Sequence, residues 1–252
     1  MNQEPRIPVM AVFGATGGIG SELAHRLVKS GWKLAIIARS PDKLQRLAEE
    51  TGALSLRADL TVSAEVDATV SRILETYGHL DGVAHCVGSL LLKPAHLTGD
   101  ADWAATIAAN LTSAFYVLRA AAKALQGQGG SIVLVSSAAA SIGLTNHEAI
   151  AAAKGGVAAL AISAAATYAP KGIRVNCVAP GLVRTPLTAR ITQSEAALRA
   201  SRSMHPLGRI GEPADVAAAI EFLLSPASSW ITGQVIGIDG GLASLKVPGV
   251  RQ

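Results

Sequence analysis

Residues 7–20 of the chain, Ile-Pro-Val-Met-Ala-Val-Phe-Gly-Ala-Thr-Gly-Gly-Ile-Gly, join a short apolar run to a glycine-rich turn. The run 7–13 predicts a buried strand, and the helical pattern after the turn ends at Gly31. Glycines let a backbone approach a phosphate closely, and a helix N-terminus offers free N–H groups and a positive dipole end. At the first strand–helix junction this turn favours a dinucleotide site over a plain turn. The residues predicted to hold the phosphates are Gly14, Thr16, Gly17, Gly18, Ile19 and Gly20.

The rest of the chain repeats the same alternation of apolar runs and helical patterns. Further strands are expected at 33–38, 54–58, 82–87, 132–135, 173–178 and 235–238, and helices at 41–52, 63–77, 101–125, 147–168 and 213–224. Strands without polar alternation that are separated by helices indicate a parallel sheet covered on both faces. No Pro/Gly/Ser-rich linker interrupts the pattern. We therefore predict a single doubly wound α/β domain over residues 1–252.

Composition excludes several classes of protein. Of the 252 residues, 50% are apolar and 16% charged, which excludes a disordered chain. The net charge is +4, but the cations are scattered singly, so we expect neither a nucleic-acid nor a membrane partner. Residues 1–10 lack the apolar segment of a signal peptide, and the long uncharged stretch 124–147 is broken by glycines. A cytoplasmic protein is expected.

The two cysteines, Cys86 and Cys177, lie far apart in apolar runs. They are expected to be reduced, buried thiols, and their spacing does not suggest a metal site. Two helical stretches, 103–118 and 155–170, carry no charge at all. A helix that is apolar all round needs partners on all sides, so we expect these helices to mediate self-association into a dimer or homotetramer.

Arg39 follows the second predicted strand, where an adenosine ribose would lie. NAD sites usually place an acidic residue there to bind the 2′-hydroxyl, whereas an arginine suits a 2′-phosphate. Arg39 could also be an ordinary surface residue. Because no acidic residue adjoins it, the sequence favours NADP(H) over NAD(H) as cofactor.

Taken together, these motifs resemble those of the short-chain dehydrogenase/reductase family over residues 7–242. Besides the glycine turn, the matching segments are Asp59-Leu60, His85-Cys86-Val87-Gly88, the loop from Pro180-Gly181 to Thr185, Pro206-Leu207-Gly208-Arg209 and Gly233-Gln234 to Asp239-Gly240-Gly241. The resemblance implies a nicotinamide-dependent oxidoreductase. The cofactor-binding residues it implies are Asp59, Leu60, Cys86, Val87, Gly88, Lys154, Pro180, Gly181, Val183 and Thr185. Phe13 and His85 depart from the residues usual in the family.

The resemblance also implies catalytic roles for Asn110, Ser137 and Lys154. The family signature places a tyrosine four residues before the lysine and thirteen after the serine. Both counts lead to Ile150. Isoleucine cannot supply a proton, so the expected general acid is missing, and such a loss typically costs about 10²–10⁴-fold in rate.

His147 is the candidate replacement. It precedes Ile150 by three residues on roughly the same helix face, and a histidine side chain titrates near neutral pH. It could equally be a polar residue at an exposed helix start, with Asn146 as the cap. The three tyrosines, Tyr77, Tyr116 and Tyr168, are expected to be packing residues.

We therefore predict an NADP(H)-dependent oxidoreductase that reduces a carbonyl, or an imine, on a small molecule with an atypical proton donor. The polar segment 185–205 is expected to be a mobile lid over the substrate. An NADP(H)-binding sensor or scaffold with little catalysis is the alternative.

Overall fold

The computed structural model describes residues 6–246 and forms one seven-stranded parallel sheet in the order β3-β2-β1-β4-β5-β6-β7. The doubly wound α/β fold is thereby confirmed. The strands are β1 (Val9–Phe13), β2 (Lys33–Ala38), β3 (Leu54–Arg57), β4 (Gly82–His85), β5 (Gly130–Val135), β6 (Ile173–Pro180) and β7 (Val235–Ile238).

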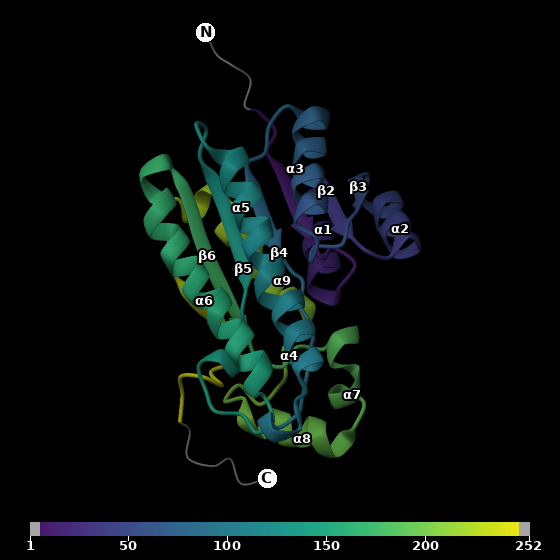
Figure 1. Cartoon of the computed structure of the whole chain (residues 1–252), viewed down its shortest axis with the longest axis vertical. Coiled ribbons are helices and arrows are strands. Elements are labelled where there is room, and N and C mark those ends of the chain that lie inside the picture. Colours follow the sequence, from purple (N-terminus) through teal and green to yellow (C-terminus); the bar gives the residue numbers. More distant parts are fainter. Residues whose placement is uncertain (1–5, 247–252) are drawn as a thin grey trace.

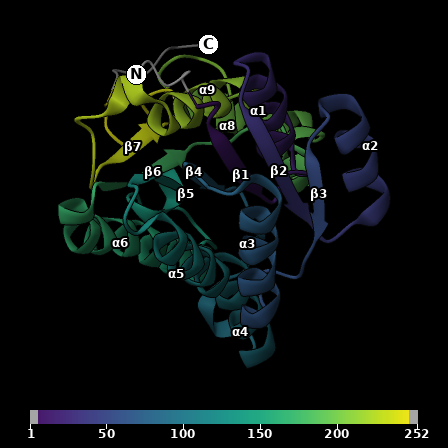
Figure 2. The same cartoon turned by 90° about the horizontal axis from the view of Figure 1, so that it is seen from above.

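Helices cover both faces of this sheet, as Figures 1 and 2 show. The larger helices are α1 (Gly18–Lys29), α2 (Pro41–Thr51), α3 (Ser63–Tyr77), α4 (Asp100–Ile107), α5 (Ser113–Leu125), α6 (Glu148–Tyr168), α8 (Glu195–Met204) and α9 (Pro213–Leu224). Apolar residues of α3, α5 and α6 form one core with the sheet, and those of α1, α2 and α9 form the other. The central strands are buried on both faces, which explains why their sequences show no polar alternation.

The point where the strand order reverses lies between β1 and β4. β1 pairs with β2 on one side and with β4 on the other, and Phe13 lies opposite both Ile37 and His85. In doubly wound sheets the crevice outside the carboxyl ends of such strands receives the ligand. The glycine turn therefore opens onto the expected binding edge.

Several predicted element ends were wrong by one or two residues. The first strand begins at Val9 rather than at residue 7, because Pro8 has no N–H to donate to the ladder. β3 and β4 end one and two residues early, at Arg57 and His85, whereas β5 begins earlier and β6 continues to Pro180. The helix expected over 101–125 is interrupted by a π-helical turn, Ala108–Thr112, between α4 and α5.

The segment predicted as a lid leaves the carboxyl end of β6. It consists of a 3₁₀ turn (Pro186–Thr188), the short helix α7 (Ala189–Thr192) and α8. In Figure 1 these elements lie together at the lower end of the molecule, beyond the strands. This position places the segment over the binding edge of the sheet.

One stretch of the described residues, Glu148–Lys171, is long and apolar enough to cross a membrane by length and composition. It comprises α6 and the turn after it, and 44% of its most apolar window is buried inside the protein. α6 packs against β5 and β6, and its Val157 and Ala161 are wholly buried in the core. The helix thus has the packing of a core helix.

Candidate active site

The glycine turn packs tightly against the end of β4. Gly14 has φ +85°, and a Cβ built on it would lie 2.9 Å from the carbonyl of Cys86. A Cβ on Gly20 would lie only 2.3 Å from the Gly14 oxygen. Gly17 caps α1 without a side-chain hydrogen bond, and the first turn of α1 contains no acidic residue. The helix N-terminus is therefore available to an anion.

A cleft of about 240 Å³ runs beside this turn and is called the turn cleft. The predicted cofactor residues that line it are Gly14, Thr16, Gly17, Arg39, Asp59, Leu60, Cys86, Val87 and Gly88. The Asp59 carboxylate accepts hydrogen bonds from the backbone N–H and hydroxyl of Thr61, at 2.9 and 2.8 Å. These bonds, with a smaller contribution from the charge of Arg39, hold the pKa of Asp59 below its ordinary value.

A larger pocket of about 660 Å³, called the lid pocket, continues from the turn cleft. Cys86, Val87, Gly88 and Ser89 line both. The other predicted site residues that line the lid pocket are Ile19, Ser137, His147, Lys154, Pro180, Gly181, Val183 and Thr185. Residues from the carboxyl ends of six strands, β1 to β6, thus meet in one continuous depression.

Two predicted residues of the glycine turn line neither space. Gly18 lies against the lid segment, where an added Cβ would stand 2.8 Å from the Thr185 methyl group. Gly20 lies under the turn, as described above. Both glycines allow the turn to pack closely against its neighbours, and neither lines the space that a cofactor would occupy.

Lys154 is buried at the base of the lid pocket, with 7% of its surface exposed. Its ammonium donates a hydrogen bond to the Val135 carbonyl at 2.8 Å and lies 3.5 Å from that of Val87. Burial lowers the pKa of Lys154 to about 8. A lysine in a cleft whose pKa is lowered towards neutral pH is typical of a functional site.

Asn110 reaches the same place from the π-helical turn. Its amide donates to the Ser89 hydroxyl and to the Thr106 carbonyl, both at 2.9 Å. A Cβ on Gly88 would lie 3.0 Å from the Asn110 carbonyl oxygen and 3.3 Å from the Lys154 nitrogen. The predicted asparagine and lysine are therefore neighbours, although Asn110 itself lines neither space.

Ser137 follows β5 in an extended conformation and accepts a hydrogen bond from the Ala139 N–H at 3.2 Å. The neighbouring Ser136 donates to the Lys154 carbonyl at 2.7 Å, which fixes the end of β5 to α6. Ser137 and Lys154 are in this way held on the same wall of the lid pocket.

Ile150 lies on that wall too, with 4% of its surface exposed. The three tyrosines all lie within the described residues, and each lies outside the lining of both spaces. Tyr77 donates to the Leu34 carbonyl at 3.1 Å, while Tyr116 and Tyr168 pack against the core. An aliphatic side chain, without a phenol beside it, occupies this part of the pocket.

His147 is the half-buried residue that precedes α6 and faces the lid pocket. Its Nδ1 lies 2.7 Å from the Thr145 carbonyl, so Nδ1 carries a proton and Nε2 remains for another partner. Asn146 adopts φ 64°, and its carbonyl accepts a hydrogen bond from the Lys93 N–H. The expected side-chain cap by Asn146 is wrong, because α6 begins without one.

Two histidines to which the sequence assigned no functional role, His85 and His205, are buried. His85 contacts the Ser113 hydroxyl through Nε2 at 3.0 Å, and its Nδ1 has no hydrogen-bond partner among the described residues. Burial, with a smaller effect of the Lys154 charge, lowers its pKa to about 3. His205 accepts from the Leu182 N–H through Nε2 at 3.2 Å and donates through Nδ1 to the Ser201 carbonyl. His205 joins α8 to the end of β6.

Sequence reasoning also missed most of the apolar wall of the lid pocket. That wall includes Leu90, Leu92, Leu144, Leu187, Ile191 and Met204. These residues come from three separate connections, and none belongs to a motif. Leu187, Ile191 and Met204 do lie in the segment 185–205 that the sequence predicted as a lid, and the adjacency of Ser89 to the segment 85–88 is a further signal in the sequence.

Comparison with known proteins agrees with this architecture. Residues 14–243 match the family model described as enoyl-(acyl carrier protein) reductase. A cis-4-hydroxycyclohexanecarboxylate dehydrogenase from Sinomonas cyclohexanicum is 37% identical over 243 residues, which cover 94% of this chain and 97% of that protein.

Two solved structures extend the comparison. A short-chain type dehydrogenase/reductase from Mycobacterium ulcerans has a TM-score of 0.89 and 37% identity, over 94% of this chain and 90% of the other. A tryptophan variant of actinorhodin polyketide ketoreductase, solved with NADPH, has a TM-score of 0.90 and 29% identity, over 95% and 98% of the two chains.

Proposed function

This chain belongs to the short-chain dehydrogenase/reductase family, and from that premise we propose an NADP(H)-dependent oxidoreductase whose proton donor is not a tyrosine. Proteins of this kind act on alcohols and ketones with a nicotinamide cofactor. The observation that carries the proposal is the continuity of the two spaces. The turn cleft and the lid pocket share residues 86–89, and Lys154 is buried where they meet.

The residues present fit a dinucleotide. The cofactor phosphates would lie at the N-terminus of α1, which is capped by Gly17 and has no acidic residue in its first turn. Asp59, Leu60 and Arg39 would hold the adenosine end, and residues 180–185 the nicotinamide end. When bound, the nicotinamide supplies or accepts the hydride. NADPH in the actinorhodin ketoreductase structure supports this assignment.

Preference for NADP(H) rests on Arg39. Its exposed guanidinium lines the turn cleft, where it could form a bidentate contact with a 2′-phosphate. The 2′-hydroxyl of NAD(H) is uncharged, so its contact with Arg39 would contribute much less to the binding free energy.

In the proposed reaction, five polar residues in or beside the lid pocket have distinct tasks. Ser137 donates a hydrogen bond to the substrate oxygen, and the Lys154 ammonium binds the ribose and favours negative charge nearby. Asn110 and Ser89 hold a water through their shared contact. His147, protonated at Nε2, donates the proton to the developing alkoxide, directly or through a water.

Ile150 limits the rate that this arrangement can reach, because it occupies the position of a general acid without supplying a proton. An imine substrate is an alternative acceptor, since an already protonated C=N group needs hydride alone. The same residue is the observation that favours the second candidate, an NADP(H)-binding sensor or scaffold.

Cofactor choice is tested by titrating the protein with NADPH and with NADH, for the parent, Arg39→Asp and Arg57→Asp. Arg57 is an exposed arginine at the end of the neighbouring strand that does not line the turn cleft, so it is the matched control. We expect Arg39→Asp to weaken NADPH binding about 10–100-fold and to leave NADH binding nearly unchanged, since a charge-assisted hydrogen bond contributes about 1.5–3 kcal/mol. Tighter binding of NADH by the parent would contradict the proposal.

Catalysis is tested by following NADPH consumption with ketones, aldehydes, quinones and imines. Turnover that falls in His147→Ala supports His147 as the donor, whereas unchanged turnover removes that role and leaves the oxidoreductase. Tight NADPH binding with no turnover on any acceptor would favour the sensor.

A further inference from the structure

Exposed apolar side chains gather around the lid pocket. Leu92, Leu187 and Met204 line the pocket and are 44%, 53% and 47% exposed. Leu92 comes from the connection after β4, and Leu187 and Met204 come from the 3₁₀ turn and from α8 of the lid segment, so their convergence is a tertiary feature. Contiguous apolar surface of this kind is typical of a binding site, because covering it removes apolar area from water.

Most polar groups of the lid pocket are already bonded to the protein. The Ser136 hydroxyl donates to the Lys154 carbonyl, and the Thr188 hydroxyl lies 2.5 Å from the Val183 carbonyl. His205 uses both ring nitrogens within the protein. Ser137, Thr145, His147 and Ser201 remain; the first three lie on the connection from β5 to α6, and Ser201 lies on α8. The free polar groups of the pocket are therefore mostly at one end, beside an apolar body.

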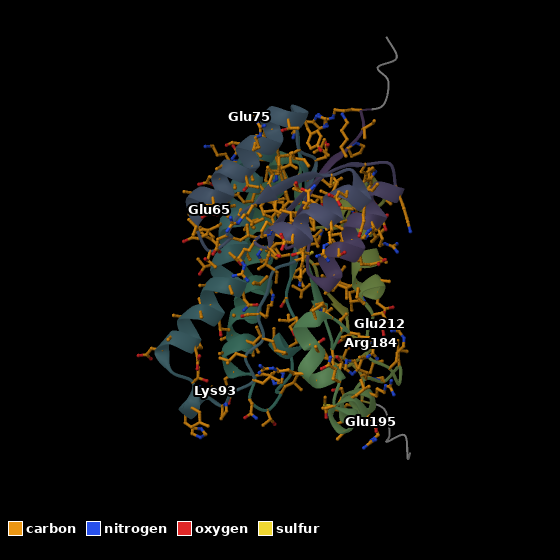
Figure 3. All side chains as sticks on the ribbon, turned by 90° about the vertical axis from the view of Figure 1, so that its right-hand side faces the viewer. Glu65, Glu75, Lys93, Arg184, Glu195 and Glu212 are labelled. Carbon is orange, nitrogen blue, oxygen red and sulfur yellow. The ribbon has the colours of Figure 1, made fainter. Side chains whose placement is uncertain are left out.

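The lining of the lid pocket also contains very few charged groups. Among the described residues that line the lid pocket there is no carboxylate and no guanidinium, and Lys154 is the one charged group besides the histidines. Two ion pairs in and beside the lid segment lie outside the pocket lining: Arg199 with Glu195, and Arg184 with Glu212. Figure 3 shows Arg184, Glu212 and Glu195 at the outer surface of this end of the molecule. A charged substrate group would have no partner along the apolar wall.

We propose that the lid pocket selects uncharged substrates that carry a single carbonyl on a large apolar body. This specificity rests on the proposed function. The carbonyl lies at Ser137, and the body lies against Leu92, Leu187 and Met204. The volume of about 660 Å³, part of which the nicotinamide takes, is that of a pocket for a drug-sized molecule rather than a three-carbon one. An anionic or polyhydroxylated body is disfavoured, because it would lose its hydration without compensation.

The first test compares methyl ketones of increasing chain length, from 2-butanone to 2-decanone, with 9-oxodecanoate as the anionic match of the longest. We expect kcat/KM to rise about threefold to fourfold for each added methylene until the pocket is filled. We expect 9-oxodecanoate to be at least about 100-fold poorer than 2-decanone, because its carboxylate would be buried unpaired. Equal rates for the two, or no dependence on chain length, would overturn the proposal.

The second test does not require turnover. Binding of Nile red, an uncharged apolar dye, is titrated against the parent, Leu187→Glu and Leu207→Glu. Leu207 is 72% exposed and lies outside the pocket lining, so it is the matched control for the charge. We expect Leu187→Glu to weaken dye binding at least tenfold and Leu207→Glu to leave it unchanged, with NADPH affinity the same in all three.

The two tests separate this inference from the proposed function. If NADPH binds and the dye binds at the lid pocket, but no ketone is reduced, the apolar selectivity stands and the oxidoreductase proposal fails. If short or carboxylated ketones are reduced best, and Leu187→Glu does not affect the dye, the oxidoreductase stands and the apolar selectivity fails.

Discussion

At the scale of single residues, Lys154 and Ile150 set the chemistry of the pocket. The lysine ammonium is held in an apolar surrounding by one short hydrogen bond to a backbone carbonyl, and burial lowers its pKa to about 8. Ile150, one turn before it on α6, makes this surrounding still less polar. The site thus buries a cation at a cost in stability, and the neighbouring Ile150 side chain has no group that could accept a hydrogen bond from it.

Removal of that cation should stabilise the protein. Between pH 8 and 10.5 the unfolded chain retains a proton that folded Lys154 gives up, so the cost of burial is full below pH 8 and fades as the pH rises. We expect Lys154→Met to increase the free energy of unfolding at pH 7 by about 1–2 kcal/mol after the lost hydrogen bond is subtracted. The advantage should shrink towards pH 10.5, and NADPH binding should weaken.

Urea unfolding at both pH values measures this difference. Lys171→Met, at the exposed end of the same helical region, is the control; it removes the contact of the Lys171 ammonium with the Tyr168 ring and should lower stability by no more than about 1 kcal/mol. A Lys154→Met variant less stable than the parent at pH 7 would mean that the bond to Val135 outweighs the cost of burying the charge.

Restoring a phenol at position 150 should accelerate the reaction. Ile150→Tyr places a hydroxyl on the pocket wall four residues from Lys154, where it could donate a proton. We expect kcat for ketone reduction to rise about 10²–10⁴-fold. Ile150→Phe has nearly the same bulk without the hydroxyl, so it should show no such gain. Equal rates for the two variants would contradict the assignment of position 150.

At the scale of elements, α6 contributes Ile150 and Lys154 to the site, and it packs closely against the π-helical turn that contributes Asn110. A Cβ on Gly156 would lie 2.7 Å from a methyl group of Leu111, which belongs to the π-helical turn. That close approach brings Asn110 of the turn towards Lys154 of the helix. The sequence predicted both helical stretches, but the π-helical turn depends on how the two pack and could not be predicted from periodicity.

The adjacent glycines of α6 provide a matched pair for this packing. Nothing lies within 4 Å of a Cβ built on Gly155, so Gly155→Ala should stabilise the helix by about 0.5–1 kcal/mol. Gly156→Ala forces Leu111 aside and should cost about 1–3 kcal/mol, with a loss of turnover. Thermal unfolding and kcat measure both effects. A stabilising Gly156→Ala would show that the π-helical turn yields at little cost.

At the scale of the whole molecule, the outer faces of the helices over one side of the sheet are unusually apolar. Phe115 on α5 and Ile162 on α6 are 45% and 51% exposed. These helices contain the two uncharged stretches seen in the sequence. Their inner sides are buried in the core, and among the described residues no helix or strand covers their outer sides, where Phe115 is contacted by the Arg119 guanidinium.

We therefore expect the protein to sediment as a dimer or tetramer at micromolar concentration. Ile162→Glu should shift it towards smaller species, because burying an unpaired carboxylate in an interface is costly. Leu97→Glu, at an exposed leucine outside α5 and α6, is the control and should leave the sedimentation coefficient unchanged. A parent protein that sediments as a monomer would remove this prediction.

The sequence by itself determined the order of strands and helices and the place of the phosphate-binding turn. Apolar runs such as β1 and the glycines after it are local signals, because burial and backbone freedom are properties of short segments. Counting along α6 also placed His147, Ile150 and Lys154 near one another, since helix geometry fixes such spacings.

Only the tertiary structure decided what surrounds those residues. The pairing of Asn110 with Ser89, the burial of Lys154 and the apolar wall made by Leu92, Leu187 and Met204 all join segments far apart in the chain. Contacts of this kind cannot be predicted from periodicity, because the pattern of each helix or strand shows which of its own residues are buried and not which other segment they meet. The glycine turn in residues 7–20 therefore fixed where we propose that a nucleotide binds, and the fold fixed what a nucleotide bound there would face.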